Sequence, residues 1–432
     1  MWNSLLFSET SIEISPNNFP ISTLKPSKLF EIQQRKQTMS HLCAPSVMKA
    51  VLCVGCTEVA YVTNVERFPE KGSRVQCQSA FMQRNGRTSN VCTALRLLGA
   101  RVELFGMLSR LGTFRMVLDD LRRRDIVISN CSWTDESPKF STIIRERRTG
   151  TCTVVRCTKA FPYVTAREFE KLDLSLYGWV HFEARSARET VLMMRRVLDH
   201  NNGLAQEDRI VVSLLVYDAL EDNLDLLSLC DYVLFGRQLA LEVGWSSAHV
   251  ACEQLNSALR TPRSIRTRRP CIICPWGKQG AVCMDAQGNF YELPAHTPKR
   301  IVDRMGDGEC FTAGFIYATF VRRRGLSGAV DFANLVASHK IASVGFDDIA
   351  NLQISPQKLE PPPVEDSERS SESEDLTNEQ RTCRKYLNRP FYTLEPHNSS
   401  IHEAVVGPEP ESEPMSEDTV KAAWERLSKT AY

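Results

Sequence analysis

The 432-residue sequence lacks the features that mark several large classes of protein. No apolar run approaches the ~20 residues needed to span a bilayer. The formal net charge is only +1, so the composition gives no reason to expect nucleic acid or a membrane surface as a partner. The N-terminal stretch MWNSLLFSETSIEIS has no basic region and contains Glu9 and Glu13, which fits neither a signal peptide nor a transit peptide. These absences predict a globular cytoplasmic protein that binds neither nucleic acid nor membrane.

A disulfide framework is also missing, although cysteine itself is frequent. The sequence has 15 cysteines, an odd number scattered without regular spacing, which predicts reduced thiols. Two CxxC pairs, Cys53 with Cys56 and Cys271 with Cys274, lie in apolar, strand-like segments. Residues three apart on a strand point to opposite faces, so these cysteines are expected to be buried core thiols. We therefore predict no metal site.

Composition divides the chain into three parts. Residues 1–47 are polar and lack a sustained period, which indicates a flexible extension or the product of an upstream start codon. Residues 48–352 hold the apolar segments and are expected to form one folded domain. Residues 353–432 are predicted to be an acidic, mostly disordered tail, because they contain a proline triplet and an acidic serine-rich stretch. A short helix near 417–429 is expected either to dock on its own domain or to bind a protein partner.

The folded part alternates short apolar runs with amphipathic segments. Strands are expected at 49–55, 102–107, 141–145, 152–157, 178–183, 209–216, 231–235, 270–275 and 281–284. Helices are expected at 89–99, 113–124, 165–170, 187–200, 222–229, 237–243, 247–260, 309–323 and 327–343. This alternation predicts an α/β fold whose mostly parallel sheet is covered on both faces. The arginine-rich segment 260–270 is interpreted as a solvated loop, with phosphate binding or docking as the alternative.

The segment DRMGDGECFTAG, residues 303–314, has features of a phosphate-binding loop. Gly306 and Gly308 permit a tight turn that brings backbone N–H groups close to a ligand. The helix predicted behind them directs its N-terminus at the same place, which favours an anion. Glu309 in the first turn is placed to accept a hydroxyl proton, as phosphoryl transfer to an alcohol requires. Glycines and acids also occur at ordinary helix N-termini, so the pattern alone does not establish catalysis.

The same loop resembles the signature of the PfkB/ribokinase family of sugar kinases, which usually reads Gly-Ala-Gly-Asp. Other segments, among them VLCVGCTEVAYV, CPWGKQGAV and ASVGFDDI, resemble the ketohexokinase (fructokinase) branch in matching order, over about residues 48–350. The resemblance implies a ribokinase-like three-layer α/β sandwich with a small β-sheet lid, formed here by 57–64, 72–82 and 139–157. It also implies ATP with Mg²⁺, a sugar or sugar-like substrate such as fructose, and a lid whose strands can pair in a homodimer.

Site residues follow from this resemblance position by position. Glu309 matches the catalytic base, usually Asp, and the anion hole is matched by Gly306, Asp307 and Gly308. The substrate-binding turn and the arginine beside the sugar pocket are matched by Gly86, Arg87, Asn90 and Arg185. The strand-turn that lines ATP is matched by Gly277, Lys278, Gln279 and Gly280, which an ordinary turn after a core strand would also explain.

Several positions depart from the family pattern. Ala60 and Gly72 stand where the resemblance implies two sugar-binding acids, and Cys152 stands where it implies a lid arginine. Arg87 replaces a sugar-binding asparagine. Asp307 replaces alanine, and its charge would repel a phosphate oxygen ~4–5 Å away by several kcal/mol. Two interpretations stay open: a sugar kinase with a more anionic substrate, or a pseudokinase that acts as a binding or regulatory module.

Overall fold

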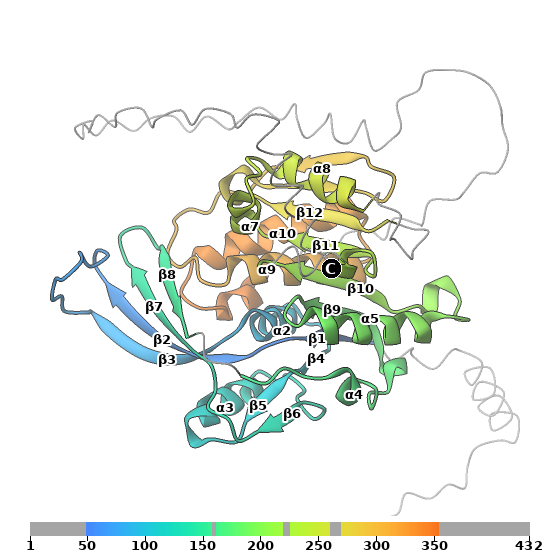
Figure 1. Ribbon diagram of the computed structural model, residues 1–432. Helices are drawn as coiled ribbons and strands as arrows, with labels where there is room; N and C mark the ends of the chain where they lie inside the picture. The colour runs from blue at the N-terminus through green and yellow to red at the C-terminus, as the bar shows by residue number, and fades with distance from the viewer. Residues whose placement is uncertain (1–48, 158–160, 219–224, 260–268, 354–432) are drawn as a thin grey trace, which may run out of the picture. The chain divides into compact units, whose positions relative to one another are not determined.

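A computed structural model of the chain describes residues 49–157, 161–218, 225–259 and 269–353 (Figure 1). The predicted extension 1–47 and most of the arginine-rich segment lie outside these ranges. Almost all of the predicted tail 353–432 also lies outside them, including the expected helix near 417–429. The predicted properties of those segments stay predictions.

A central sheet forms the middle of the described domain. Its strands are β1 Ala50–Val54, β4 Val102–Phe105, β9 Tyr177–Glu183, β10 Val211–Val216, β11 Tyr232–Phe235, β12 Cys271–Pro275, β13 Ala281–Met284 and β14 Phe290–Leu293. Their spatial order is β14-β13-β12-β11-β10-β9-β1-β4. Neighbours from β12 to β4 pair in parallel, whereas β13 and β14 add antiparallel pairings at one edge. The predicted, mostly parallel sheet is therefore confirmed.

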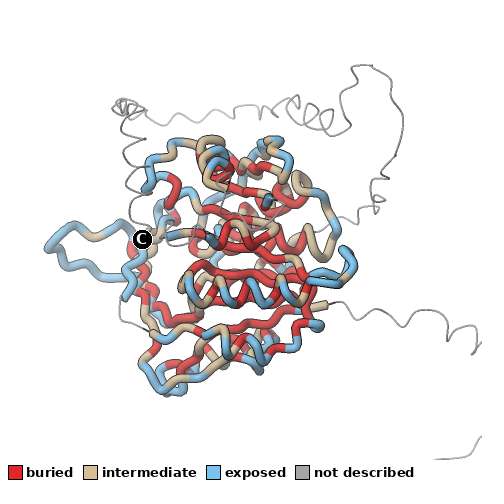
Figure 2. Tube along the Cα trace, turned by 45° about the vertical axis from the view of Figure 1, so that its right-hand side comes forward, coloured by how far each residue is buried: buried red, intermediate tan, exposed pale blue. Residues whose placement is uncertain are grey.

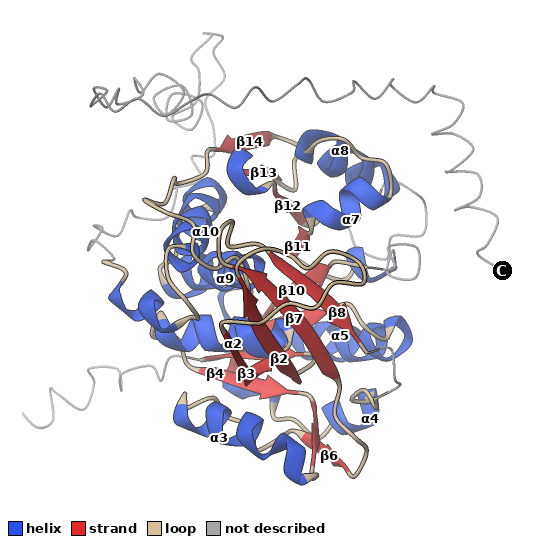
Figure 3. Ribbon diagram, turned by 90° about the vertical axis from the view of Figure 1, so that its left-hand side faces the viewer, coloured by secondary structure: helices blue, strands red, loops and turns tan. Residues whose placement is uncertain are grey.

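Helices cover both faces of this sheet. They are α2 Arg87–Leu97, α3 Arg115–Arg123, α4 Ala166–Phe169, α5 Ala187–Asn201, α7 Arg237–Glu242, α8 Ala248–Ala258, α9 Asp307–Ile316 and α10 Leu326–Ile341. Alternate strand residues point to opposite faces, so Val51 and Cys53 join one buried cluster while Leu52 and Val54 join the other. The first cluster includes side chains of α2, α3, α9 and α10, and the second includes side chains of α4, α5, α7 and α8. Figure 3 shows the resulting three layers, which confirm the predicted sandwich.

A second sheet projects from the central body and forms the lid (Figure 1). In spatial order its strands are β3 Ser79–Asn85, β2 Glu58–Val65, β7 Phe140–Glu146 and β8 Cys152–Arg156. The predicted lid segments 57–64 and 139–157 correspond to β2 and to β7 with β8. The predicted segment 72–82 was placed too early, because Gly72 has a φ of 80° and Ser73 N bonds back to Glu70 O. These residues form a turn, and the strand begins only at Ser79.

Other elements differ in detail from the prediction. The strand β14 and the pair β5 Met107–Ser109 with β6 Ser132–Thr134 were not expected, and the expected helix 222–229 lies partly outside the described residues. The expected helix 309–323 consists of α9 and a π-helical turn, Tyr317–Val321. Short 3-10 turns are Gly112–Phe114, Leu174–Leu176, Gln206–Asp208, Gly277–Gln279 and Asp347–Asn351.

Burial follows the layers of the fold. In Figure 2 the buried residues concentrate along the central sheet and the inner faces of its helices, while the far end of the lid is exposed. The inner side of the lid is different, because Ala60, Val62 and Ile143 pack with Met305 there. None of the described helices is both long and apolar enough to cross a membrane.

Candidate active site

The candidate site lies at the carboxyl ends of the central strands. The strand β1 has β4 on one side and β9 on the other, so the chain reverses its direction of travel across the sheet at β1. Open α/β sheets bind ligands outside such a reversal of strand order. At this point the backbone N–H of Cys56, just after β1, donates to Glu183 Oε2 at the end of β9, with 3.0 Å between the atoms. Residues that follow adjacent strands therefore meet at the switch point.

Glu183 is the buried centre of this cluster. Its side chain is fully buried and accepts hydrogen bonds from Arg185 Nε at 3.1 Å and Tyr217 OH at 2.8 Å. The hydroxyl of Thr88, in the first turn of α2, also donates to Glu183. Burial alone would raise the pKa of Glu183, but the Arg185 charge and these hydrogen bonds lower it to about 2. An ionised carboxylate thus fixes the side chains around it.

Arg87 lies in front of this cluster, at the first position of α2. Its guanidinium stacks on the Tyr217 ring, 4.0 Å from the ring centroid. Arg87 Nη1 lies 3.3 Å from Glu309 Oε1, so the residue that matches the family's substrate-binding asparagine forms an ion pair with the candidate base. The side chains of Arg87 and Glu309 are 29% and 11% exposed. This contact joins α2 to α9 across the mouth of the switch point.

The signature loop has the backbone expected of a phosphate cradle. Gly306 is the N-cap of α9 with φ 83° and ψ 13°, in the left-handed region that favours glycine. A Cβ at this position would lie 2.4 Å from Cζ of Phe346, so packing also requires glycine. A Cβ at Gly308 would meet open space. The first turn of α9 therefore leaves room for a ligand at Gly308 while Gly306 is held by the fold.

Asp307 changes the electrostatics of this cradle. Its Oδ1 accepts a hydrogen bond from the backbone N–H of Gly308 at 2.7 Å. The carboxylate reaches solvent, yet reduced hydration among the surrounding protein atoms and the charge of Glu309 raise its pKa to about 6. One donor of the predicted anion hole is thus already occupied by a carboxylate of the same loop.

A buried ion cluster connects the loop to the lid. Asp303 and Lys340 are fully buried, and Lys340 Nζ lies 3.1 Å from Asp303 Oδ2 and donates to Asp303 O at 2.8 Å. Arg145 of β7 lies 3.2 Å from Asp303 Oδ2. Cys152, which stands where the family has a lid arginine, lies beside the same carboxylate at 3.9 Å. The lid is therefore fixed to the residues that lead into the phosphate cradle.

The structure brings several sequence-predicted residues together. Glu309, Arg87 and Arg185 are joined through Tyr217 and Glu183, and Gly86 is the N-cap of α2 directly before Arg87. Asn90 is buried on the same helix, where its side-chain amide bonds Asn85 Oδ1 at 3.0 Å. Arg84 Nη1 in turn donates to Asn90 Oδ1 at 3.3 Å. Both ends of the Asn90 amide therefore have protein partners.

The predicted nucleotide turn, formed by Gly277, Lys278, Gln279 and Gly280, connects β12 to β13. Gly280 has a φ of 88°, and a Cβ there would lie 2.0 Å from Leu293 O. Close packing against β14 therefore accounts for this glycine. Lys278 and Gln279 are exposed. Their role toward ATP stays a prediction.

Four residues of this cluster were not predicted as site residues: Cys56, Thr88, Glu183 and Tyr217. Glu183 ends the buried strand YGWVHFE, and a lone acid at the carboxyl end of a central strand was the available signal. The expectation of buried CxxC thiols holds for Cys53 and Cys274 but is wrong for Cys56 and Cys271, which are half-buried. Cys56 lies beyond the end of β1, and Cys271 is the first residue of β12. Within the described ranges, no three His, Cys, Asp or Glu side chains gather as a metal site would require.

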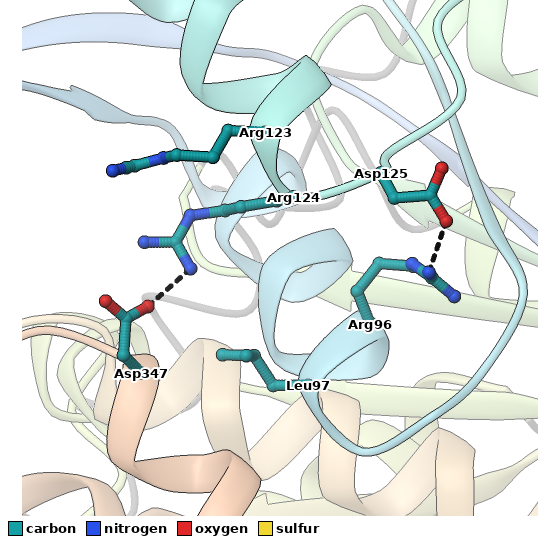
Figure 4. A pocket seen from close by; sticks show the side chains of 6 residues that line it. All are labelled: Arg96, Leu97, Arg123, Arg124, Asp125 and Asp347. Carbon is teal, nitrogen blue, oxygen red and sulfur yellow. Dashed lines mark hydrogen bonds and ion pairs between the residues drawn. The ribbon is translucent and has the colours of Figure 1, made fainter.

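A separate surface pocket of about 440 Å³ is lined by Arg96, Leu97, Arg123, Arg124, Asp125 and Asp347. Figure 4 shows Arg124 paired with Asp347, and Arg96 paired with Asp125. The pocket lies at the C-terminal ends of α2 and α3, whereas Arg87 is at the N-terminus of α2. Its cations are already neutralised by carboxylates, so the switch point is the better candidate site.

Comparison with known proteins identifies the family of the chain. Residues 48–351 match the pfkB family carbohydrate kinases. The chain is 30% identical to ketohexokinase of Mus musculus over 302 residues, which are 70% of this chain and 99% of that protein. A ribokinase structure from Giardia lamblia has a TM-score of 0.58 at 16% identity, covering 70% of this chain and 96% of the other. Arabidopsis thaliana ribokinase complexed with ribose and ATP has a TM-score of 0.54 at 16% identity, again over 70% and 96%. The chain therefore belongs to the pfkB family of carbohydrate kinases.

Proposed function

We propose that this protein transfers the terminal phosphoryl group of ATP to a hydroxyl of a sugar or sugar-like molecule, and that fructose is a poor substrate. The observation that carries the proposal is the N-terminus of α9, where Glu309 stands in the first turn and Gly308 leaves open space. A helix N-terminus favours phosphate oxygens, and a carboxylate beside it can accept the proton of an attacking hydroxyl.

In the proposed reaction, the hydroxyl oxygen of the substrate bonds to the terminal phosphorus of ATP. The bond from that phosphorus to its bridging oxygen breaks, the hydroxyl proton passes to Glu309, and ADP leaves. Bound Mg²⁺ would neutralise charge on the transferred phosphate, and the turn 277–280 would line the nucleotide. The relatives support ATP as donor, because the solved ribokinases of Arabidopsis thaliana and Cryptococcus neoformans are complexes with ATP and ADP.

Two differences argue against fructose as the substrate. Ala60 is fully buried in an apolar cluster with Met305, so it offers no acceptor to sugar hydroxyls. Arg87 carries a charge where the family has a neutral amide, and this charge is engaged by Glu309. A neutral sugar that needs Glu309 as its base would have to break that ion pair without replacing it. We therefore expect weak fructokinase activity or none.

A pseudokinase is the second candidate, and Asp307 is the observation that favours it. The Asp307 carboxylate accepts the N–H of Gly308 within the loop that would hold phosphate. A phosphate oxygen would have to replace this carboxylate and tolerate its charge nearby. In that case the fold acts as a binding or regulatory module, with the tail 353–432 engaging a protein partner.

The proposal also covers the location and the oligomeric state of the protein. We propose that it is cytoplasmic and that it forms a homodimer through the lid strands. Large apolar side chains are exposed on those strands, with Tyr61, Met82 and Val155 on one face of the lid sheet and Phe81 and Val154 on the other. Exposed apolar patches on a sheet commonly mark protein–protein contacts. Analytical ultracentrifugation of the wild-type chain and of Val155→Lys tests the dimer, which the lysine should dissociate.

One experiment separates the two candidate functions. The thermal midpoint of the full chain is measured with and without Mg-ATP, and ADP release is then followed with a panel of sugars. A kinase predicts a higher midpoint with Mg-ATP and sugar-dependent ADP release. In Glu309→Gln the midpoint shift should persist while ADP release falls by at least about a hundredfold, because the base is gone. No nucleotide shift and no ADP release with any sugar would exclude the kinase.

A further inference from the structure

We propose that the substrate of this site carries an anionic group in addition to the hydroxyl that is phosphorylated. The anionic group, a carboxylate or a phosphate, binds the guanidinium of Arg87 and replaces Glu309 there. Glu309 is then free to act as the base. This inference rests on the proposed function, since it names the substrate class of the same site.

The guanidinium of Arg87 has binding capacity to spare. An arginine side chain carries five N–H donors in a planar fork that matches a carboxylate or phosphate. Arg87 contacts Glu309 through only one of these donors, with 3.3 Å between Nη1 and Glu309 Oε1. Its Nε is buried and finds no hydrogen-bond partner among the residues that the structure describes. Because protein already covers Nε, a ligand would use the Nη donors that the single contact with Glu309 leaves over, on a side chain that is 29% exposed.

Arg87 is also held ready for a ligand. Its guanidinium lies 4.0 Å from the centroid of the Tyr217 ring, and Tyr217 OH is fixed by a 2.8 Å hydrogen bond to Glu183 Oε1. The Tyr217 ring thereby sets the plane of the guanidinium, and the Arg87 side chain remains 29% exposed. Less conformational entropy is lost on binding when the cation is already oriented.

The neighbouring arginine, Arg185, differs from Arg87 in its partners. Arg185 donates from Nε to the fully buried Glu183 and from Nη2 to Cys56 Sγ at 3.2 Å. Its charge is therefore balanced by a carboxylate that the fold keeps ionised. Arg87 is paired instead with Glu309, the residue that must become available for the reaction. An anionic substrate that replaces Glu309 keeps the Arg87 charge paired and leaves only Glu309, the proposed base, without its partner, whereas a neutral sugar would leave both charges unpaired.

Binding measured without nucleotide tests this inference independently of catalysis. Titration calorimetry on the full chain compares fructose with fructose 6-phosphate, and glucose with gluconate. At least one anionic sugar should bind ten times more tightly than its neutral counterpart or better, and the pair that shows the difference identifies phosphate or carboxylate. Arg87→Gln should reduce that ratio to less than threefold. Arg110→Gln, which removes another partly exposed arginine, should leave the ratio unchanged.

Glu309→Gln tests the competition between Glu309 and the substrate anion, because a merely structural ion pair would not change the affinity for an anionic sugar. Removing the internal competitor for Arg87 should tighten binding of the anionic sugar several-fold and leave the neutral one unchanged. This variant also decides the question if Arg87→Gln unfolds, as judged by circular dichroism. Equal binding of neutral and anionic sugars, or no binding of either, overturns the inference. Preferential binding of anionic sugars without ADP release would support the anion site and reject the kinase activity. Phosphorylation of neutral sugars without that preference would support the kinase activity and reject the anion site.

Discussion

Arg87 Nη1 and Glu309 Oε1 lie 3.3 Å apart, and the residues that carry them are separated by 222 positions in the sequence. Both depart from the pattern that the family resemblance implies, which has an asparagine and an aspartate at these positions. The longer acid reaches the arginine from the first turn of α9, and the arginine meets it from the first turn of α2. The two changes thus meet in one ion pair, in which the added charge of Arg87 faces a carboxylate whose charge the family pattern already has.

A double-mutant cycle should detect this pairing in the stability of the protein. Arg87→Gln, Glu309→Gln and the double variant are compared by urea denaturation. We expect a coupling free energy of about 1 kcal/mol, because the pair is only partly exposed and one partner is also held by Tyr217. The more exposed pair Arg110–Asp135, 3.7 Å apart, serves as the comparison and should give less than about 0.5 kcal/mol. Additive effects at positions 87 and 309 would mean that the two side chains do not interact in solution.

Glu183 should make the stability of the domain depend on pH in the acid range. Its pKa falls from an ordinary 4.5 to about 2 in the folded protein, so the ionised form stabilises the fold above about pH 4.5. That contribution is lost as the pH falls from about 4.5 toward 2. Glu183→Gln should cost roughly 3 kcal/mol of unfolding free energy at pH 7, because Arg185 loses its buried partner.

Urea titrations of wild type and Glu183→Gln between pH 7 and pH 3 measure this effect. The difference between them should shrink as the pH is lowered. Glu66→Gln, at an exposed position, should stay within about 0.5 kcal/mol of wild type throughout. A constant difference at every pH would show that the carboxylate charge is not what stabilises the cluster.

Local sequence patterns predicted the scaffold of the site and not its contacts. The run VLCV of β1 and the glycines of the signature loop are local signals, and they place a strand end and a helix N-terminus correctly. Glu183 is the last residue of a fully buried strand, so the apolar pattern around it hides its polar role. Tyr217 follows β10 and reaches the site only because β10 lies next to β9. Contacts of this kind depend on strand order, which no local pattern contains.

The register of the lid shows the same limit. Gly72 was expected within a lid strand, but it lies in a turn before β3. The strand is fixed by pairing over its whole length with β2, from Glu58 opposite Asn85 to Asn64 opposite Ser79. Most side chains on this strand are exposed, so apolar and polar residues do not alternate clearly along it. The two-residue period of a strand therefore does not locate the start of β3 in the sequence.

The two glycines of the phosphate loop should respond differently to the same substitution. Gly306→Ala must adopt a φ of 83° and meets the Phe346 ring at 2.4 Å, so we expect a loss of about 2–4 kcal/mol in unfolding free energy. Gly308→Ala meets open space in the first turn of α9 and should change stability by less than about 0.5 kcal/mol. The same alanine should weaken binding of Mg-ADP, because its methyl group fills the space left for phosphate. Chemical denaturation and calorimetry measure both quantities, and equal losses of stability would contradict the assigned geometry.

Asp307 should make nucleotide affinity depend on pH. Its pKa is raised to about 6, so the carboxylate is charged at pH 7.5 and largely neutral at pH 5. Because the charge lies in the loop that would hold phosphate, wild-type affinity for Mg-ADP should rise as the pH falls through 6. Asp307→Asn should bind Mg-ADP about tenfold more tightly at pH 7.5, an effect of roughly 1.4 kcal/mol, and should gain little on acidification.

Calorimetric titrations of both proteins from pH 7.5 to pH 5 test this, with the ionisation of ADP itself common to the two series. Asp135→Asn removes an exposed aspartate outside the loop and should reproduce the wild-type pH curve. If Asp307→Asn retains the wild-type slope, the titrating group is not Asp307. If it binds ADP no better at pH 7.5, the charge in the cradle does not oppose phosphate, and the observation that favours a pseudokinase loses its force.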